Sequence, residues 1–178
     1  MDKKQSDLKD KLYWKWFFGV TIFTGMILMV LQIDIYRSTI IDSTIPLSII
    51  LGVGVLTYLL LQRKYKEVYN VRGFFYPLMQ SLLSFGFIAC YIFMAGNFYL
   101  AGRDSKQFTF PIKEKSSMPG TSNKSKRMPL VRFDYFGEEK ELVFGYSSTA
   151  KVEESDFVTL TIKKGAFGFM VLESYNVK

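Results

Sequence analysis

The feature of this sequence that most constrains its fold is a set of three long apolar segments without a single Asp, Glu, Lys or Arg. They read FFGVTIFTGMILMVLQI (17–33), IPLSIILGVGVLTYLLLQ (45–62) and PLMQSLLSFGFIACYIFMAGNFYLA (77–101). At ~1.5 Å per residue, each can cross a hydrocarbon core of ~30 Å with help from flanking residues. We therefore predict a three-helix transmembrane bundle in residues 1–101, with helices at about 14–33, 45–62 and 77–101.

Two other interpretations of these segments fit less well. Buried helices of a globular protein would need a large polar shell, and residues 1–101 hold only six acidic and ten basic side chains. A cleavable signal peptide has an apolar region of ~7–15 residues followed by a small-residue cleavage site. The first segment is longer and ends LQIDIYRS, so we expect a retained anchor.

Basic residues flank the predicted spans unevenly. Five lysines precede the first span, one arginine lies between the first and second, and four basic residues lie between the second and third. Because cytoplasmic loops are enriched in Lys and Arg, we expect an integral inner (cytoplasmic) membrane protein with a cytoplasmic N-terminus. Residues 102–178 would then lie outside the cytoplasm. Four cations after the last span oppose this orientation, although a translocated folded domain is partly exempt from the rule: Arg103, Lys106, Lys113 and Lys115.

The spans offer little for moving ions. Pumps and proton relays place ionisable groups at membrane depth, and these spans have none. Transport or a channel is therefore a minor hypothesis. We expect the polar side chains of the third span to hydrogen-bond to neighbouring helices or to backbone: Gln80, Ser81, Ser84 and Asn97.

Each span carries a pair of small residues four positions apart. Such pairs lie on one helix face and let backbones approach closely, which predicts a compact bundle or a dimer interface. The candidate helix-packing residues are Thr21 with Gly25, Ser48 with Gly52, and Gly86 with Cys90.

From residue 107 the apolar period changes to two, which predicts strands with one buried face. The predicted strands are QFTFPIKEK (107–115), LVRFDYFG (130–137), ELVFGY (141–146), FVTLTIKK (157–164) and FMVLESYNV (169–177), with a polar loop at SSTAKVEESD (147–156). Five strands in residues 102–178 favour a small antiparallel β barrel or curled sheet. Pro111 predicts that the first strand lies at a sheet edge.

A β domain this small is near the lower limit for a self-sufficient core. It has no cysteine, and the chain has no histidine, so neither disulfides nor imidazole metal sites support it. We expect it to lean on the bundle, a second copy or a partner. It also has more phenylalanines than one buried face needs, and the candidates for an exposed patch are Phe136, Phe157 and Phe167.

The catalytic inventory argues against an enzyme. Without histidine, Ser-His and Cys-His activation and the commonest general base are missing. The single cysteine, Cys90, lies inside a span and cannot build a zinc site. The carboxylates near residues 138–141 and 153–156 are typical of solvated loops. We expect no catalytic residue, no cofactor and no metal.

The layout resembles a class of small bacterial inner-membrane proteins of unknown function, with three N-terminal spans and a short extracytoplasmic β domain. The closing phrase DFVTLTIKKGAFGFMVL, a strand, a glycine turn and a second strand, shares that pattern. Composition and layout together leave three hypotheses. They are an accessory or assembly subunit of an envelope complex that binds a protein partner, a toxin-immunity membrane protein, and a transport component.

A basic segment, KSSMPGTSNKSKRMP (115–129), connects the first two predicted strands. Its Ser, Asn, Gly and Pro content predicts a long hairpin loop rather than a linker between domains. Three of its cations are candidate contacts for acidic lipid headgroups or a partner: Lys124, Lys126 and Arg127. Because the predicted orientation places the loop outside the cytoplasm, we expect membrane lipid and a protein partner or a second copy, but no nucleic acid.

Overall fold

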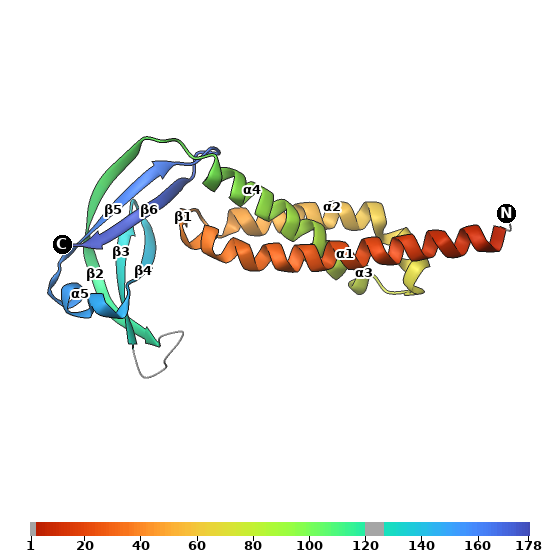
Figure 1. Cartoon of the computed structure of the whole chain (residues 1–178), viewed down its shortest axis with the longest axis horizontal. Helices are drawn as coiled ribbons and strands as arrows, with labels where there is room; N and C mark the ends of the chain where they lie inside the picture. Colours follow the sequence, from red (N-terminus) through yellow and green to blue (C-terminus); the bar gives the residue numbers. More distant parts are fainter. Residues whose placement is uncertain (1–2, 120–126) are drawn as a thin grey trace. The chain divides into compact units, whose positions relative to one another are not determined.

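The fold divides into a helical unit and a sheet unit (Figure 1). The structure is a computed structural model and describes residues 3–119 and 127–178. The helical unit comprises Met1–Ala101 together with Gly165–Phe169, and the sheet unit comprises Gly102–Lys164 and Met170–Lys178. The short turn Gly165–Phe169 therefore belongs to the helices, although it connects two strands.

In the part of the chain that the structure describes, three helices are long and apolar enough to cross a membrane, as predicted. The first two are α1 (Lys3–Arg37) and α2 (Thr44–Tyr69), and both extend beyond their apolar segments into flanking polar sequence. The helix α2 continues through RKYKEVY because these residues are good or neutral helix formers. It ends at Asn70, whose left-handed backbone (φ 54°) directs its N–H to the carbonyl oxygen of Lys66.

The third span is one continuous helix with a π-helical segment in its middle. It runs through α3 (Phe75–Ser81), the π segment η1 (Leu82–Gly86) and α4 (Phe87–Tyr99). A π segment adds a residue to one turn and is not encoded in hydrophobic periodicity, so the sequence did not predict it. Figure 1 shows this helix running alongside α1 and α2.

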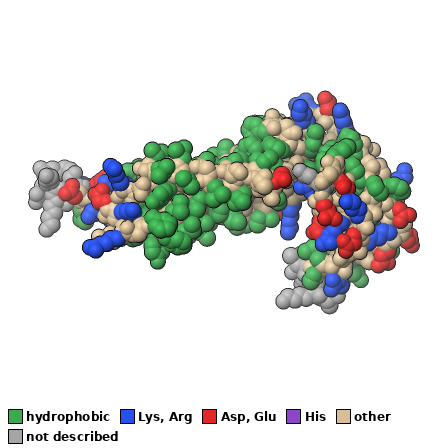
Figure 2. Space-filling model, turned by 180° about the vertical axis from the view of Figure 1, so that it is seen from behind, with side chains coloured by type: hydrophobic (Ala, Val, Ile, Leu, Met, Phe, Trp, Pro, Cys, Tyr) green, Lys and Arg blue, Asp and Glu red, His purple; other side chains and the backbone are tan. Residues whose placement is uncertain are grey.

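A buried apolar cluster of the helical unit lies between the C-terminal end of α1 and the middle of α4. The fully buried members are Ile35, Ile41, Cys90 and Met94. Most other apolar side chains of the helices point outward, as the hydrophobic surface in Figure 2 shows. An apolar exterior suits lipid as solvent and would be unfavourable in water.

The described residues form six strands rather than the five predicted, because the two-residue strand β1 (Thr39–Ile40) follows α1. The five strands of the sheet unit form a curled antiparallel half barrel (Figure 1) with the order β6-β5-β2-β3-β4. They are β2 (Ser105–Pro119), β3 (Arg127–Tyr135), β4 (Glu138–Val143), β5 (Phe157–Lys164) and β6 (Met170–Val177). The apolar residues of alternate positions fill the core, including Val131, Phe133, Val158, Leu160, Ile162 and Val171.

The prediction that Pro111 marks an edge strand is wrong, because β2 lies in the middle of the strand order. The strand changes partner at this residue. From Ser105 to Pro111 it pairs with β5, and from Ile112 to Pro119 it pairs with β3. Each half of β2 therefore pairs along one edge only. Pro111 is the last residue paired with β5, so its missing N–H interrupts neither ladder.

Two connections differ from the sequence-based expectation. The polar stretch 147–156 contains the 3-10 turn η2 (Tyr146–Ser148) and the helix α5 (Thr149–Glu154), which buries Val152 in the sheet unit.

The basic hairpin is confirmed, but its strands extend further into the segment 115–129 than predicted. Pro119 pairs with Arg127, which leaves only residues 120–126 between the described strands.

Candidate interaction surfaces

Gly25 of α1 and Gly86 of η1, two of the small residues singled out in the sequence, lie where helices touch. A Cβ atom at Gly25 would overlap the carbonyl oxygen of Leu83 and lie 2.8 Å from the Cα atom of Ser84. A Cβ atom at Gly86 would lie 2.7 Å from the carbonyl oxygen of Ile50 in α2. Both contacts are with backbone, which cannot move aside as a side chain can, so these two approaches of the π segment to α1 and α2 require glycine.

The pair on α2 behaves differently. Ser48 and Gly52 are exposed, and a Cβ atom at Gly52 would meet nothing within 4 Å. The close contact of α2 is instead at Gly54, where an added Cβ would overlap the side chain of Leu82. Spacing alone could not separate Gly52 from Gly54, since both lie in the same apolar run. A dimer interface at Ser48 and Gly52 stays a prediction.

The remaining two helix-packing candidates have hydrogen-bond partners. The hydroxyl of Thr21 donates to the carbonyl oxygen of Phe18 one turn earlier, at 3.2 Å. The thiol of Cys90 is fully buried and accepts a hydrogen bond from Nε2 of Gln32 in α1 at 3.0 Å. Its Sγ lies 3.7 Å from the carbonyl oxygen of Pro46 in α2. Cys90 thus connects α4 to both other helices.

The polar residues of the third span bond to backbone, as expected. Nε2 of Gln80 donates to the carbonyl oxygen of Phe18 in α1 at 2.8 Å. The hydroxyls of Ser81 and Ser84 donate to carbonyl oxygens four residues earlier in their own helix. Gln80 therefore connects the third span to α1, whereas the two serine hydroxyls are satisfied within their own helix.

Asn97 holds the turn Gly165–Phe169 against α4, which the sequence did not predict. Its side chain is completely buried, accepts a hydrogen bond from the Phe167 N–H at 3.0 Å and donates to the Phe169 carbonyl at 3.1 Å. A Cβ atom at Gly165 would overlap the Asn97 amide, so the turn requires glycine there. The partners are 70 and 72 residues apart, and no local pattern could have revealed them.

Phe167, one of the candidate patch residues, lies in this turn. Its ring is 52% exposed and stacks on Phe93 of α4 with 5.1 Å between ring centroids and 11° between planes. Gly96 lets it approach, since an added Cβ there would lie 3.0 Å from the ring. Phe167 therefore contributes to the attachment of the turn while one face of its ring stays accessible.

Phe136 occupies the tip of the β3–β4 hairpin in a backbone conformation that disfavours bulky side chains. Phe136 (φ 51°) and Gly137 (φ 98°) are the two central residues of the loop, and Tyr135 pairs with Glu138 on either side. Positive φ at both positions defines a type I′ turn, for which Asn-Gly is the preferred sequence. The phenylalanine ring is nevertheless 73% exposed.

The Phe136 ring caps an aromatic cluster of the sheet unit. Its centroid lies 5.0 Å from that of Tyr135, 5.6 Å from Phe110 and 6.1 Å from Phe108, each in an edge-to-face arrangement. Phe108 and Phe110 lie on the core face of β2 and are themselves half-buried. The exposed ring thus extends the apolar core to the surface at one hairpin, which we call the aromatic tip (Phe108, Phe110, Tyr135 and Phe136).

The other surface candidates lie apart from the aromatic tip. Phe157 is 48% exposed and precedes Val158, which is fully buried, so its ring lies on the opposite face of the sheet. Arg127 is bound within its own hairpin, with Nε donating to the Ser117 hydroxyl at 2.7 Å. Lys124 and Lys126 lie outside the described residues.

Ion pairs cover the outer side of β2, β3 and β4. Arg132 contacts Glu141 at 2.5 Å and Glu114 at 2.8 Å, and these two carboxylates raise the pKa of its guanidinium. Asp134 accepts the Gly137 N–H at 2.5 Å and pairs with Lys113 at 3.1 Å. The backbone hydrogen bond and, after it, the Lys113 ammonium hold the pKa of the Asp134 carboxyl below its ordinary value. The pairs are solvent-exposed, so each adds little stability.

Within residues 3–119 and 127–178, no group of three or more Asp, Glu, Cys or His side chains is arranged to hold a metal ion.

Comparisons of the chain with protein-family models, curated proteins and solved structures found no match.

Proposed function

We propose that this chain is a non-enzymatic, membrane-anchored module of a bacterial envelope, an accessory or assembly subunit whose sheet unit binds a protein partner through the aromatic tip. Its three apolar helices support anchoring in the inner membrane. The flanking Lys and Arg residues favour a cytoplasmic N-terminus and an extracytoplasmic sheet unit.

The observation that carries the proposal is the conformation and exposure of Phe136. A left-handed backbone costs a side-chain-bearing residue roughly 1–2 kcal/mol, and Asn and Gly tolerate it best. Full burial of a phenylalanine returns about 1.5–3 kcal/mol, but this ring is 73% exposed and recovers a small part of that. The strain that asparagine would relieve is similar in size to what the ring gains from partial burial and from its edge-to-face contacts, at about 0.5–1.5 kcal/mol per pair, so the hairpin alone would be about as stable with asparagine. Aromatic residues, phenylalanine included, are enriched at protein interfaces relative to the rest of the surface.

Site-specific photo-crosslinking in native membranes tests the proposal. Benzoylphenylalanine in place of Phe136 should capture one protein partner in the full-length chain. The same residue in place of Phe157, an exposed phenylalanine on the opposite face, is the matched control and should capture much less. No protein adduct at position 136 in cells that contain the folded chain would contradict the proposal.

Phe136→Asn separates a binding role from a folding role. The change relieves the left-handed strain and removes the ring, so we expect stability within about 1 kcal/mol of the parent chain. Co-purification of the crosslinked partner in mild detergent should fall at the same time. A large loss of stability would show that the ring serves the fold.

A further inference from the structure

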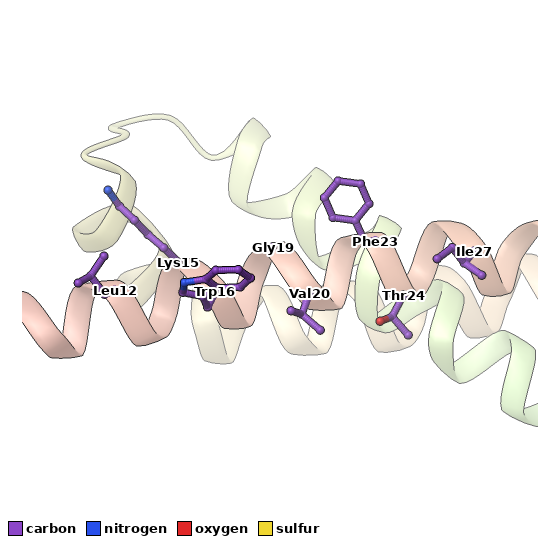
Figure 3. A pocket seen from close by; sticks show the side chains of 8 residues that line it. All are labelled: Leu12, Lys15, Trp16, Gly19, Val20, Phe23, Thr24 and Ile27. Carbon is purple, nitrogen blue, oxygen red and sulfur yellow. The ribbon is translucent and has the colours of Figure 1, made fainter.

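An apolar groove runs along the outward face of α1 (Figure 3). It has a volume of about 460 Å³, and one helix supplies all of its lining. The lining residues are Leu12, Lys15, Trp16, Gly19, Val20, Phe23, Thr24 and Ile27.

The groove exists because Gly19 leaves a gap between two large rings. A Cβ atom at Gly19 would meet nothing within 4 Å. Trp16 and Phe23, one turn to either side, are 73% and 70% exposed and project from the helix as Figure 3 shows. A flexible hydrocarbon chain fits a shallow depression of this kind between aromatic walls.

Lys15 supplies a cation at one end of the groove. Among the described residues, Lys15 forms no ion pair, whereas Lys64 of α2 is paired with Asp10 at 2.7 Å and with Glu67 at 3.4 Å. The Lys15 ammonium therefore keeps its charge available for an anion, and Trp16 beside it is a residue type enriched at the membrane interface.

The length of the groove fits a lipid better than a second helix. From Leu12 to Ile27 the helix rises about 22 Å at ~1.5 Å per residue, close to half of the ~40–45 Å thickness of a bilayer with its headgroup regions. A partner helix would cross both leaflets, while a phospholipid in the leaflet nearer the N-terminus places its phosphate at one end and its acyl chain along one leaflet.

We propose that this groove binds an anionic phospholipid, with its phosphate at the Lys15 ammonium and one acyl chain lying over Gly19 between Trp16 and Phe23. Juxtamembrane basic residues favour anionic over zwitterionic lipids by electrostatic attraction. The proposal depends on α1 crossing a membrane and is independent of the protein partner proposed above.

Quenching of Trp16 fluorescence by brominated lipid tests the site directly. The chain has two tryptophans, so Trp14→Phe in the full-length protein leaves Trp16 as the only reporter. The protein is reconstituted into phosphatidylcholine vesicles with a fixed fraction of phosphatidylglycerol, and bromine is carried by the acyl chains of one lipid or the other. One basic residue near the membrane surface favours an anionic lipid by ~1 kcal/mol, which corresponds to about a five-fold ratio of binding constants. We therefore expect phosphatidylglycerol to bind about five-fold more strongly than phosphatidylcholine.

Two pairs of variants separate this site from general attraction to a basic helix. Lys15→Gln should abolish the preference, whereas Lys11→Gln, which removes an equal charge outside the groove, should retain most of it. Gly19→Leu should fill the groove and lower quenching by both lipids. Gly52→Leu, at a glycine equally free of neighbours on α2, should leave quenching unchanged.

Three results would overturn the proposal. The first is equal quenching of Trp16 by both lipids in the starting protein. The second is an equal loss of preference in Lys15→Gln and Lys11→Gln, which would indicate an unspecific basic surface. The third is loss of the preference when excess inorganic phosphate is added, which would show that the site recognises phosphate alone.

Discussion

Substituting Gly25 by alanine probes how closely α1 approaches the third span. The new methyl group would overlap the Leu83 carbonyl oxygen and lie 2.8 and 2.9 Å from the Cα and carbonyl oxygen of Ser84. Relieving three backbone contacts requires the helices to separate, and overpacking of this kind costs about 1–3 kcal/mol. Alanine recovers ~1 kcal/mol of helix propensity. The overpacking cost minus the gain in helix propensity is about 0–2 kcal/mol. Because three backbone contacts must be relieved, we expect Gly25→Ala to destabilise the helical unit by about 2 kcal/mol, the upper end of this range.

Gly52→Ala is the matched control, because a methyl group there meets nothing within 4 Å and gains the same propensity of up to ~1 kcal/mol. The two variants should therefore differ by about 3 kcal/mol in free energy of unfolding. Unfolding by SDS titration in mixed micelles, followed by tryptophan fluorescence, measures this difference. Equal stability of the two variants would refute the close approach at Gly25. A change of oligomeric state in Gly52→Ala alone would reveal a dimer interface on α2.

Three further changes test other contacts. Asn97→Leu removes the acceptor of the Phe167 N–H, which costs about 0.5–1.5 kcal/mol, and hydrogen exchange at that amide should accelerate. Asp134→Asn should lower the free energy of unfolding most above pH ~4. Since the Asp134 pKa is lowered in the folded state, its stabilisation is present above the unfolded pKa and disappears as pH falls through the folded one. Denaturation of both proteins across that pH range checks this. Tyr175→Phe removes the hydrogen bond to the Val143 carbonyl (2.7 Å), and urea denaturation should show a loss of about 0.5–1.5 kcal/mol.

The spans could be predicted because a lipid solvent requires a long run of apolar residues, and this requirement is local in sequence. The strands were predictable for the same kind of reason, since alternation over five to eight residues reports one buried face. The helix bounds were not, because α1 and α2 continue into polar residues, where helix propensity acts together with contacts between the helices such as that of Tyr65 with Phe18. The helix α5 was missed because its six residues carry one buried side chain, Val152.

Candidate residues were harder to place than elements. Small residues at helical spacing identified Gly25 and Gly86, which lie at helix contacts, but also Gly52, which does not. The difference lies in the rotation of each helix about its axis, which depends on all three helices at once. Phe136 was singled out for excess aromaticity, while the feature that distinguishes it, a positive φ, is a property of the folded hairpin.

The attachment of the turn Gly165–Phe169 to Asn97 has a consequence for biosynthesis. The helix α4 leaves the ribosome some 70 residues before the two backbone groups that its buried amide needs. Until Phe167 and Phe169 have been made, Asn97 is a polar group in an apolar span without its native partners, a costly state that insertion must tolerate. A chain that stalls or is cut before the turn would carry this defect permanently.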